Sequence, residues 1–420
     1  MRVLITATGS HGDINPFIAI GRALQARGHQ AAFLANPYFQ AQAEEAGLEF
    51  IGLGERFELR DLKNYPDVMH PRKGGKVVIK DWLAPFADET MKVLPGLLDS
   101  WKPDAIVHHH IAMAAPWVCE KRGLPCVNCV LAPMMWMNPS DTISPMAWSP
   151  LYPGKLYKWF FRRVGVPMLR RQINSWINPL REKHGLAPQE NCWQELSRGG
   201  VACLGLWSPV LRGPLDGDPD NSLITGFARY DRHGPQEQAP QDVERFLSAG
   251  EPPILFSLGT AAVHVAGRFY HDAAEACRML GRRGMLLIAN TGLKIDNLPK
   301  GVETFTYIPF SQVMPRVAAS VHHGGIGTTG QAMAAGRPTV VVPHAHDQYD
   351  NAARVKRLGI SETLKRGQLS AGGLAKALRT VLENPTFTSR AADVSRRMAE
   401  ENGSAAAAIE VERVVRASRG

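Results

Sequence analysis

The sequence predicts an α/β protein with two domains, each built on a parallel sheet, that meet at a ligand cleft. Its 420 residues exceed one ordinary core, so two domains of roughly 200 residues each are expected. Strand-like and helix-like segments alternate along both halves, which is typical of βαβ units. The two halves also open alike, with an apolar strand that ends in glycine and a hydroxyl residue: RVLITATGS at 2–10 and PPILFSLGT at 252–260.

The N-terminal domain is expected to comprise residues 1–215. After the opening strand, the pattern predicts a helix in PFIAIGRALQARG and strands in four apolar segments: QAAFLAN, LEFIGL, DAIVHHH and PCVNCVLA. The segment LYKWFFRRVGVPMLRRQINSW, residues 156–176, interrupts this alternation with aromatic and basic residues at helical spacing. Two interpretations stay open for it: an amphipathic helix that covers the domain or borders its substrate side, or a basic aromatic face that contacts a membrane surface.

A linker is expected at residues 216–250, because proline, glycine and acidic residues dominate RGPLDGDPDNS and RHGPQEQAPQDVE. The C-terminal domain, residues 251–390, follows with a helix-like stretch and four strand-like ones: FYHDAAEACRMLGRRG, then MLLIAN, VETFTYI, SVHHGG and TVVVP. Residues 391–420 are expected to form helix interrupted near Gly403, for which packing against the N-terminal domain is one option.

Composition narrows the classes of partner. The formal charge of +9 suits an anionic ligand or an anionic membrane surface. Nucleic acid is not expected as a partner, because the basic residues are dispersed and no zinc-finger or RNA-recognition motif accompanies them. Apolar runs are too short for a signal peptide or a membrane span. Cys126 and Cys129 are interpreted as buried reduced thiols, with a redox or metal role as the lesser alternative, and the cytoplasm is the expected compartment.

A glycine-rich turn at residues 322–338, HHGGIGTTGQAMAAGRP, joins a strand-like segment to a helix-like one. The first N–H groups of a helix lack internal partners and carry the positive end of its dipole, and glycines let phosphate oxygens approach them. The turn is neither a Walker A loop nor a first-strand dinucleotide fingerprint. A diphosphate is therefore the predicted ligand, with an ordinary tight turn as the alternative.

With its continuation SVHHGGIGTTGQAMAAGRPTVVVPHAHDQYDNAARV, this turn closely resembles the donor-binding signature of nucleotide-sugar-dependent glycosyltransferases of the B-type fold (GT-B). GSHGDINP, FSLGT and YIP extend the resemblance over nearly the whole chain. The family is the UDP-glycosyltransferase superfamily, in the bacterial branch near rhamnolipid rhamnosyltransferases and sterol and glycopeptide glucosyltransferases. The resemblance implies two Rossmann-like domains that face each other across a cleft. It also implies an inverting hexosyltransferase with a UDP-glucose or dTDP-rhamnose type donor and no cofactor.

The resemblance assigns the diphosphate to five residues. His323 stands where the family has the histidine that contacts the diphosphate. Gly325, Thr328 and Thr329 fall on the phosphate-binding turn, and Thr260 faces them across the cleft.

Sugar and base contacts follow from the same resemblance. Asp347 and Gln348 match a pair that hydrogen-bonds the hydroxyls of the transferred sugar. Tyr307 matches an aromatic that stacks on the base, and the backbone of Ile308 would read the base edge. Gln331 stands in place of the glutamate that binds the ribose, and Phe310 replaces a glutamine, so both UDP and dTDP sugars stay open.

Asp13 is the predicted general base. It follows the first strand, and relatives of the sterol, glycopeptide and rhamnolipid type carry an aspartate there. A carboxylate facing the cleft would take the proton of an acceptor hydroxyl, a contribution of about 10²–10⁴-fold. The alternative is that Asp13 only caps a helix beginning near Ile14. His11 is interpreted as an acceptor-side contact or as a merely exposed side chain.

The histidine run 108–110 suggests a metal site at first sight. Side chains alternate along a strand, so the three rings are not expected to converge, although His109 alone is a candidate for the acceptor side. No HExxH motif, Cys/His quartet or suitably flanked DxD motif occurs. The predicted enzyme is therefore metal-independent, with the helix N-terminus and His323 meeting the charge of the leaving group.

The acceptor is expected to be apolar, because APMMWMNPSDTISPMAW at 132–148 is rich in aromatic residues and methionines. Packing of the domain core explains the same residues almost as well. Two other functions remain as alternatives: a nucleotide-sugar epimerase of the same fold, and a non-catalytic partner subunit that binds sugar nucleotides. Contact with the inner face of the membrane likewise stays open.

Overall fold

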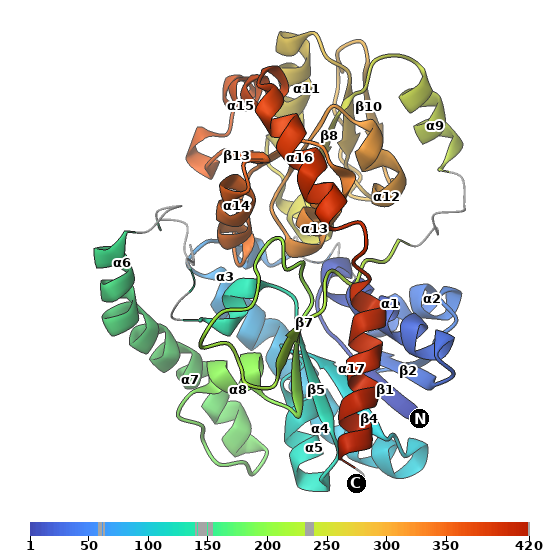
Figure 1. Cartoon of the computed structure of the whole chain (residues 1–420), viewed down its shortest axis with the longest axis vertical. Coiled ribbons are helices and arrows are strands. Elements are labelled where there is room, and N and C mark those ends of the chain that lie inside the picture. The colour runs from blue at the N-terminus through green and yellow to red at the C-terminus, as the bar shows by residue number, and fades with distance from the viewer. Residues whose placement is uncertain are drawn as a thin grey trace.

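The computed structural model describes residues 1–57, 61, 64–138, 141, 149, 154–231 and 239–418. It has two α/β domains stacked along the long axis of the molecule, and both chain termini lie in the same domain (Figure 1). Each domain contains one all-parallel sheet. The GT-B architecture of two Rossmann-like domains is thereby confirmed.

The N-terminal sheet has the strand order β3-β2-β1-β4-β5-β6-β7. Its strands are β1 (Arg2–Thr6), β2 (Gln30–Ala35), β3 (Glu49–Gly52), β4 (Ala105–His109), β5 (Cys126–Val130), β6 (Ala202–Gly205) and β7 (Ser222–Ile224). The first five coincide with the expected strands. β6 and β7 have no expected counterpart.

Helices cover both faces of this sheet because its side chains alternate in direction. Val3 and Ile5 of β1 pack in one core with α1 (His11–Ala26) and α17 (Gly403–Ala417). Leu4 points the other way, into a core with α4 (Ala84–Trp101) and α5 (Ala114–Arg122). The remaining helices of this domain are α2 (Gln40–Glu45), α3 (Gly74–Val77), α6 (Lys155–Phe160), α7 (Val166–Lys183) and α8 (Cys192–Arg198).

The C-terminal sheet repeats the pattern with the order β10-β9-β8-β11-β12-β13. Its strands are β8 (Ile254–Ser257), β9 (Gly284–Leu287), β10 (Val302–Phe305), β11 (Ala319–His322), β12 (Thr339–Val341) and β13 (Ser361–Thr363). One face packs against α11 (Phe269–Leu280) and α15 (Ala371–Glu383). The other packs against α9 (Gln241–Ser248), α12 (Phe310–Val313) and α13 (Ile326–Ala335). Helices α10 (Gly259–Ala262), α14 (Gln348–Arg357) and α16 (Pro385–Arg397) complete the domain.

The expected linker, residues 216–250, contains ordered elements. β7 pairs in parallel with β6 in the N-terminal sheet. Val243 and Phe246 of α9 lie in the core of the C-terminal domain, where they contact the face that includes Leu255. Polar turns flank these short elements, so the composition of the whole segment resembled that of a linker. Residues 232–238 lie outside the described part of the chain.

The C-terminal segment crosses between the domains. α16 packs beside α13 in the C-terminal domain, and α17 runs down along α1 and β1 of the N-terminal domain (Figure 1). Glu412 of α17 pairs with Arg27 at 2.5 Å and with His29 at 2.8 Å. These contacts join residues almost four hundred positions apart in the sequence.

A mixed core joins the two domains. Trp136 and Trp207 of the N-terminal domain, whose rings meet at 4.6 Å, pack with Met333 and Ala352 of the C-terminal domain. Asp141 accepts hydrogen bonds from Arg354 of α14, at 2.7 Å, and from Arg212, at 3.3 Å. Breaking a buried ion pair leaves an uncompensated charge and is strongly destabilising. This network therefore holds the two domains together at this part of their interface. Of segment 132–148, Met134 and Trp136 are buried, as the core-packing alternative expects; residues 139–140 and 142–148 lie outside the described chain.

Candidate active site

Each sheet reverses its strand order once, and side chains predicted for the site follow the strands at these points. In the C-terminal sheet the reversal lies between β8 and β11, which are hydrogen-bonded neighbours. Thr260 follows β8 and His323 follows β11. Ligands of open α/β sheets bind outside the carboxyl ends of the strands at such a point.

Two glycines enclose the imidazole of His323. A Cβ on Gly259 would lie 2.4 Å from the ring, and a Cβ on Gly325 would also lie 2.4 Å from it. The β8–α10 turn and the β11–α13 turn therefore touch through this ring, and any larger residue at either glycine would displace it. The Nδ1 atom of His323 is buried and has no hydrogen-bond partner among the described residues. Burial, with further contributions from His322 and His344, lowers the pKa of His323 far below its usual value, so the ring is neutral.

The N-terminus of α13 has no anion of its own. Gly325 is its N-cap, no side chain caps it, and no acidic residue lies in its first turn. Thr328 is partly buried, whereas Thr329 is buried and donates its hydroxyl to the carbonyl of Gly325 at 3.0 Å. Gln331 lies one turn further along the helix and is partly buried. The first N–H groups of α13 therefore have neither an intrahelical acceptor nor a capping side chain.

Asp347 and Gln348 lie at the N-terminus of α14. The carbonyl oxygen of the Gln348 side chain accepts hydrogen bonds from the backbone N–H groups of His344, at 2.8 Å, and Ala345, at 3.1 Å. Asn351 donates to the carboxylate of Asp347 at 2.7 Å and to the carbonyl of Gly324 at 2.9 Å. Asn351 thereby ties the Asp347 carboxylate to the glycine turn.

The predicted base-binding residues lie in the loop between β10 and α12. The Tyr307 side chain is 37% exposed, whereas Ile308 is 4% exposed and packs in the domain core. An exposed ring beside a buried aliphatic anchor fits a stacking platform, and Phe310 begins α12 directly after this loop.

In the N-terminal sheet the order reverses between β1 and β4. Asp13 follows β1 in the first turn of α1, which begins at His11, so the expected helix start near Ile14 is wrong. Ser10 is the N-cap, because GSHGD gives the chain a turn at Gly9 with φ +124°. One carboxylate oxygen of Asp13 accepts from the backbone N–H of Ser10 at 2.7 Å and from its hydroxyl at 3.0 Å. Burial raises the pKa of Asp13, against the opposing effects of these hydrogen bonds and of nearby His346.

His109 ends β4, beside β1, and is buried. Its Nδ1 lies 3.1 Å from the carbonyl oxygen of Thr8, and its Nε2 has no partner among the described residues. The strand ends at His109, and the ring of His110 lies 4.5 Å from that of His109, edge to face. Among the described residues the three histidines of the run do not form a metal-binding group. Burial lowers the pKa of His109 to about 3 and that of His108 to about 4.

The hydrogen bonds that Asp13 accepts from the two groups of Ser10 do not involve the His11 side chain. Its Nδ1 is 2.9 Å from the side-chain oxygen of Gln42, and its ring packs against Tyr38 and Phe39. This side chain is partly buried rather than simply exposed.

The two strand-order reversals meet at the domain interface. Helix α1 contacts α10 and α13. His346, with φ 55°, lies between the domains: its Nε2 is 2.9 Å from the carbonyl oxygen of Val68. Burial, with a smaller contribution from the nearby carboxylate of Asp13, raises the pKa of Asp347 to about 7, against the opposing effect of the hydrogen bond from Asn351. Two carboxylates from opposite domains are therefore held within electrostatic range of each other.

Ser10, His346 and Asn351 are the positioning residues that the sequence analysis missed. The first could have been found from the capping preference of serine before an acidic residue. His346 and Asn351 carry no such signal, because their partners Val68 and Gly324 are distant in the sequence.

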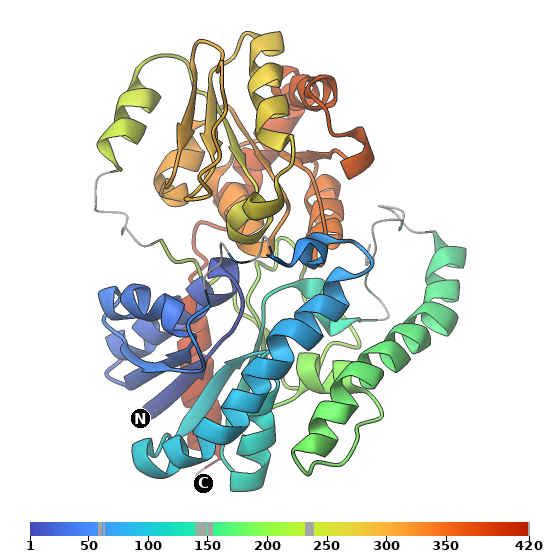
Figure 2. The same ribbon diagram turned by 180° about the vertical axis from the view of Figure 1, so that it is seen from behind.

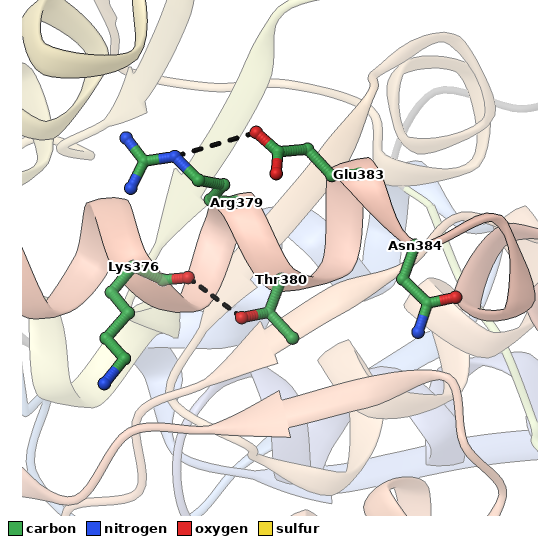
Figure 3. A pocket seen from close by; sticks show the side chains of 5 residues that line it. All are labelled: Lys376, Arg379, Thr380, Glu383 and Asn384. Carbon is green, nitrogen blue, oxygen red and sulfur yellow. Dashed lines mark hydrogen bonds and ion pairs between the residues drawn. The ribbon is translucent and has the colours of Figure 1, made fainter.

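Two surface hollows lie elsewhere. The one in Figure 3, of about 370 Å³, lies on the exposed side of α15 and is lined by Lys376, Arg379, Thr380, Glu383 and Asn384. Arg379 pairs with Glu383 at 3.6 Å, and the hollow contains none of the predicted site residues. The other, of about 330 Å³, adjoins the Arg354–Asp141 network.

Within the described residues, no three His, Cys, Asp or Glu side chains are grouped so as to hold a metal ion. All six cysteines are buried free thiols, Cys126 and Cys129 among them. Of the helices that the structure describes, none is both long and apolar enough to cross a bilayer.

Family models match both domains. The model of the glycosyltransferase family 28 N-terminal domain covers residues 3–136. The model of the C-terminal domain of erythromycin biosynthesis protein CIII-like proteins covers residues 285–417. The chain belongs to the UDP-glycosyltransferase superfamily. It is a glycosyltransferase.

Relatives extend over nearly the whole chain. O-mycaminosyltylonolide 6-deoxyallosyltransferase of Streptomyces fradiae is 28% identical over 98% of this chain and 97% of its own length. A sterol 3-beta-glucosyltransferase of Debaryomyces hansenii is 24% identical over 94% of this chain, which spans 26% of that longer protein.

Solved glycosyltransferases share the fold. The kitacinnamycin glycosyltransferase has a TM-score of 0.74 and 21% identity over 99% of both chains. VinC, solved in complex with dTDP, has a TM-score of 0.69 and 20% identity over the full length of both chains.

Proposed function

We propose that this glycosyltransferase moves a hexose from a UDP-glucose or dTDP-rhamnose type donor to a hydroxyl of a lipophilic acceptor, with inversion and with Asp13 as general base. One observation carries the proposal: a carboxylate in the first turn of α1 and the N-terminus of α13, which no side chain caps, belong to helices in contact across the domain interface. The first suits a proton acceptor and the second a diphosphate.

The reaction follows from these positions. The acceptor oxygen forms a bond to the anomeric carbon as Asp13 takes its proton. The bond from that carbon to the diphosphate oxygen breaks, and its electron pair leaves with the nucleoside diphosphate. First-turn N–H groups of α13 and the imidazole of His323 stabilise the charge that develops on the leaving group. Asp347, held by Asn351, orients the hydroxyls of the sugar.

A carboxylate in this position matches the demands on a base. Burial raises the pKa of Asp13 and so gives it more affinity for a proton than an ordinary aspartate has, while the Ser10 hydrogen bonds act in the opposite direction. Donation from Ser10 also fixes one oxygen, which leaves the other for the acceptor hydroxyl.

The nucleotide and the acceptor are the finer part of the proposal. The dTDP complex of VinC and the replacement of two family residues by Phe310 and Gln331 favour a dTDP sugar. Relatives named for a macrolide and for sterols favour a bulky apolar alcohol. The cytoplasm, next to the membrane, is the proposed compartment.

A donor-by-acceptor screen tests the proposal. UDP and dTDP sugars are incubated with a macrolide aglycone or a sterol, products are found by mass spectrometry, and NMR gives the anomeric configuration. We expect transfer with inversion, and a nucleotide at 100 times its Kd should add about 2.7 kcal/mol of stability. Donor alone is the control: conversion without acceptor would favour the epimerase, and nucleotide binding without turnover on any acceptor would favour the partner subunit.

A further inference from the structure

An apolar stripe is exposed at the start of the long helix formed by α6, a π-helical turn (Phe161–Gly165) and α7. Of the twelve large apolar side chains that are exposed among the described residues, five lie here within thirteen residues. They are Leu156 (80% exposed), Trp159 (59%), Phe160 (55%), Val164 (39%) and Met168 (67%). Scattered exposed apolar residues are ordinary, but such a concentration marks an interaction surface.

The spacing places these side chains on one side of the helix. Leu156, Phe160, Val164 and Met168 follow at intervals of four residues, with Trp159 next to them. Further along, Ile173 and Ile177 are buried against Trp117 of the domain core. The helix is thus anchored at its C-terminal end, while α6 reaches out at the edge of the molecule, as Figures 1 and 2 show from both sides.

The charged residues of this helix from Lys155 to Arg171 are all positive. Lys155, Arg162, Arg163, Arg170 and Arg171 are exposed, and none of them forms an ion pair with another described residue. No Asp or Glu occurs from Gly154 to Arg181. A second copy of this chain would bring like charges together, whereas an anionic bilayer accepts both the apolar side chains and the basic ones.

We propose that the stripe of Leu156, Trp159, Phe160, Val164 and Met168 docks this protein on an anionic membrane surface. The helix lies in the plane of the interface, its apolar side chains enter the boundary between headgroups and acyl chains, and its arginines contact lipid phosphates. Docking stands on this surface alone. That the bilayer also delivers the lipophilic acceptor rests on the proposed function.

Co-sedimentation of the full chain with vesicles tests the docking. We expect the protein to pellet with vesicles of phosphatidylcholine and phosphatidylglycerol, to stay in the supernatant with phosphatidylcholine alone, and to be released at high salt, because salt screens the basic residues. Equal recovery in the supernatant with both vesicle types would overturn the proposal.

Two double variants locate the contact. W159S/F160S and R162E/R163E should each lower the vesicle partition coefficient roughly tenfold or more. The matched controls are M279S/I409S, which removes exposed apolar side chains elsewhere, and K294E/K376E, which reverses exposed charges on the C-terminal domain. Both controls should pellet as the wild type does.

Further readouts separate the remaining outcomes. Unchanged pelleting of both stripe variants would assign binding to another surface and overturn the proposal. A wild-type oligomer that W159S/F160S converts to a monomer, without vesicle binding, would make a second copy the occupant and overturn it as well. The salt and lipid dependence of the wild type does not rely on variant folding. Nucleotide-induced thermal shifts report the donor site separately, so failure of docking and failure of the transferase proposal are distinguishable.

Discussion

The β1–α1 turn and the β11–α13 turn both flank a strand-order reversal, yet their helix N-termini differ in what they hold. The entrance of α1 already contains an anion, because the carboxylate of Asp13 accepts from the N–H and the hydroxyl of Ser10. The entrance of α13 has a glycine N-cap, no acidic residue and no capping side chain. One turn is completed by its own carboxylate, and the other leaves its N–H groups for an anion from outside.

This difference gives the two domains their separate tasks in the proposed reaction. An internal carboxylate repels a diphosphate from α1 and serves as a proton acceptor. The bare turn attracts a diphosphate, and the small residues on both sides of His323 allow close approach. The same topology therefore supports opposite chemistry, decided by a few residues in each turn.

The largest effect is expected from Asp13→Asn, which removes the proton acceptor of the first turn. The asparagine oxygen still accepts from Ser10, so the turn should persist. We expect kcat to fall by roughly 10²–10⁴-fold while nucleotide affinity stays unchanged. Steady-state kinetics and calorimetry measure the two quantities. Asp272→Asn, in the first turn of α11, is the matched control, and an active Asp13→Asn enzyme would transfer the role of base to another group such as His109.

Adding a side chain to the glycine N-cap of α13 should have the next largest effect. In Gly325→Ala the new Cβ would lie 2.4 Å from Nε2 of His323, so the ring must move. We expect nucleotide affinity to fall about a hundredfold, which corresponds to ~2.7 kcal/mol. Gly372→Ala is the control, since its Cβ would meet no atom within 4 Å. Equal nucleotide affinity of both variants would show that the diphosphate binds elsewhere.

Features whose residues stand together in the sequence could be predicted from it. Buried parallel strands are near-continuous apolar runs, and ten of the strands were predicted on that basis. The glycine turn was predicted because its unusual residues stand together in the sequence. β6, β7 and β13 were not predicted, and their place in the sheets is fixed by pairing with a neighbouring strand.

Contacts between distant segments account for what the sequence did not reveal at the site. The hydrogen bond between His346 and Val68 joins residues 278 positions apart, and the proximity of Asp13 to Asp347 exists only once the domains have packed. The Ser10–Asp13 pair was local and could have been predicted. The roles of Asp13, His323 and Asp347 remain predictions until the variants are measured.

Removal of the His323 imidazole should lower nucleotide affinity less than Gly325→Ala does. In His323→Ala the N–H groups of α13 remain, and one hydrogen bond to a charged group is lost, a loss of about 1.5–3 kcal/mol. We expect nucleotide affinity to fall roughly ten- to a hundredfold in calorimetry. His271→Ala on α11 is the control, and unchanged affinity for His323→Ala would exclude this ring from the nucleotide site.

A smaller effect is expected on stability, through Asp347. Its pKa is about 7 in the folded protein, above the ordinary 3.8. The folded state therefore binds more protons than the unfolded state between these values, and this group's contribution to stability is lost as pH rises through that window. Asp347→Asn should raise the Tm by a few degrees at pH 8 and hardly at pH 4. Thermal melts at both values, with Asp393→Asn as control, test this; equal shifts at both pH values would contradict the raised pKa.

The smallest expected effect is that of EDTA, which should leave transfer activity intact. In the proposed reaction, positive potential at the leaving group comes from the N-terminus of α13 and the imidazole of His323. Activity assays after chelation, with and without added Mg²⁺ or Mn²⁺, measure the effect. Loss of activity with EDTA and its return with a metal would contradict this account of the leaving group and would indicate a metal ion bound between the two domains. Asp13 and Asp347, which lie within electrostatic range of each other, would then be candidate ligands of one ion, and Asp13→Asn would lose metal affinity along with kcat.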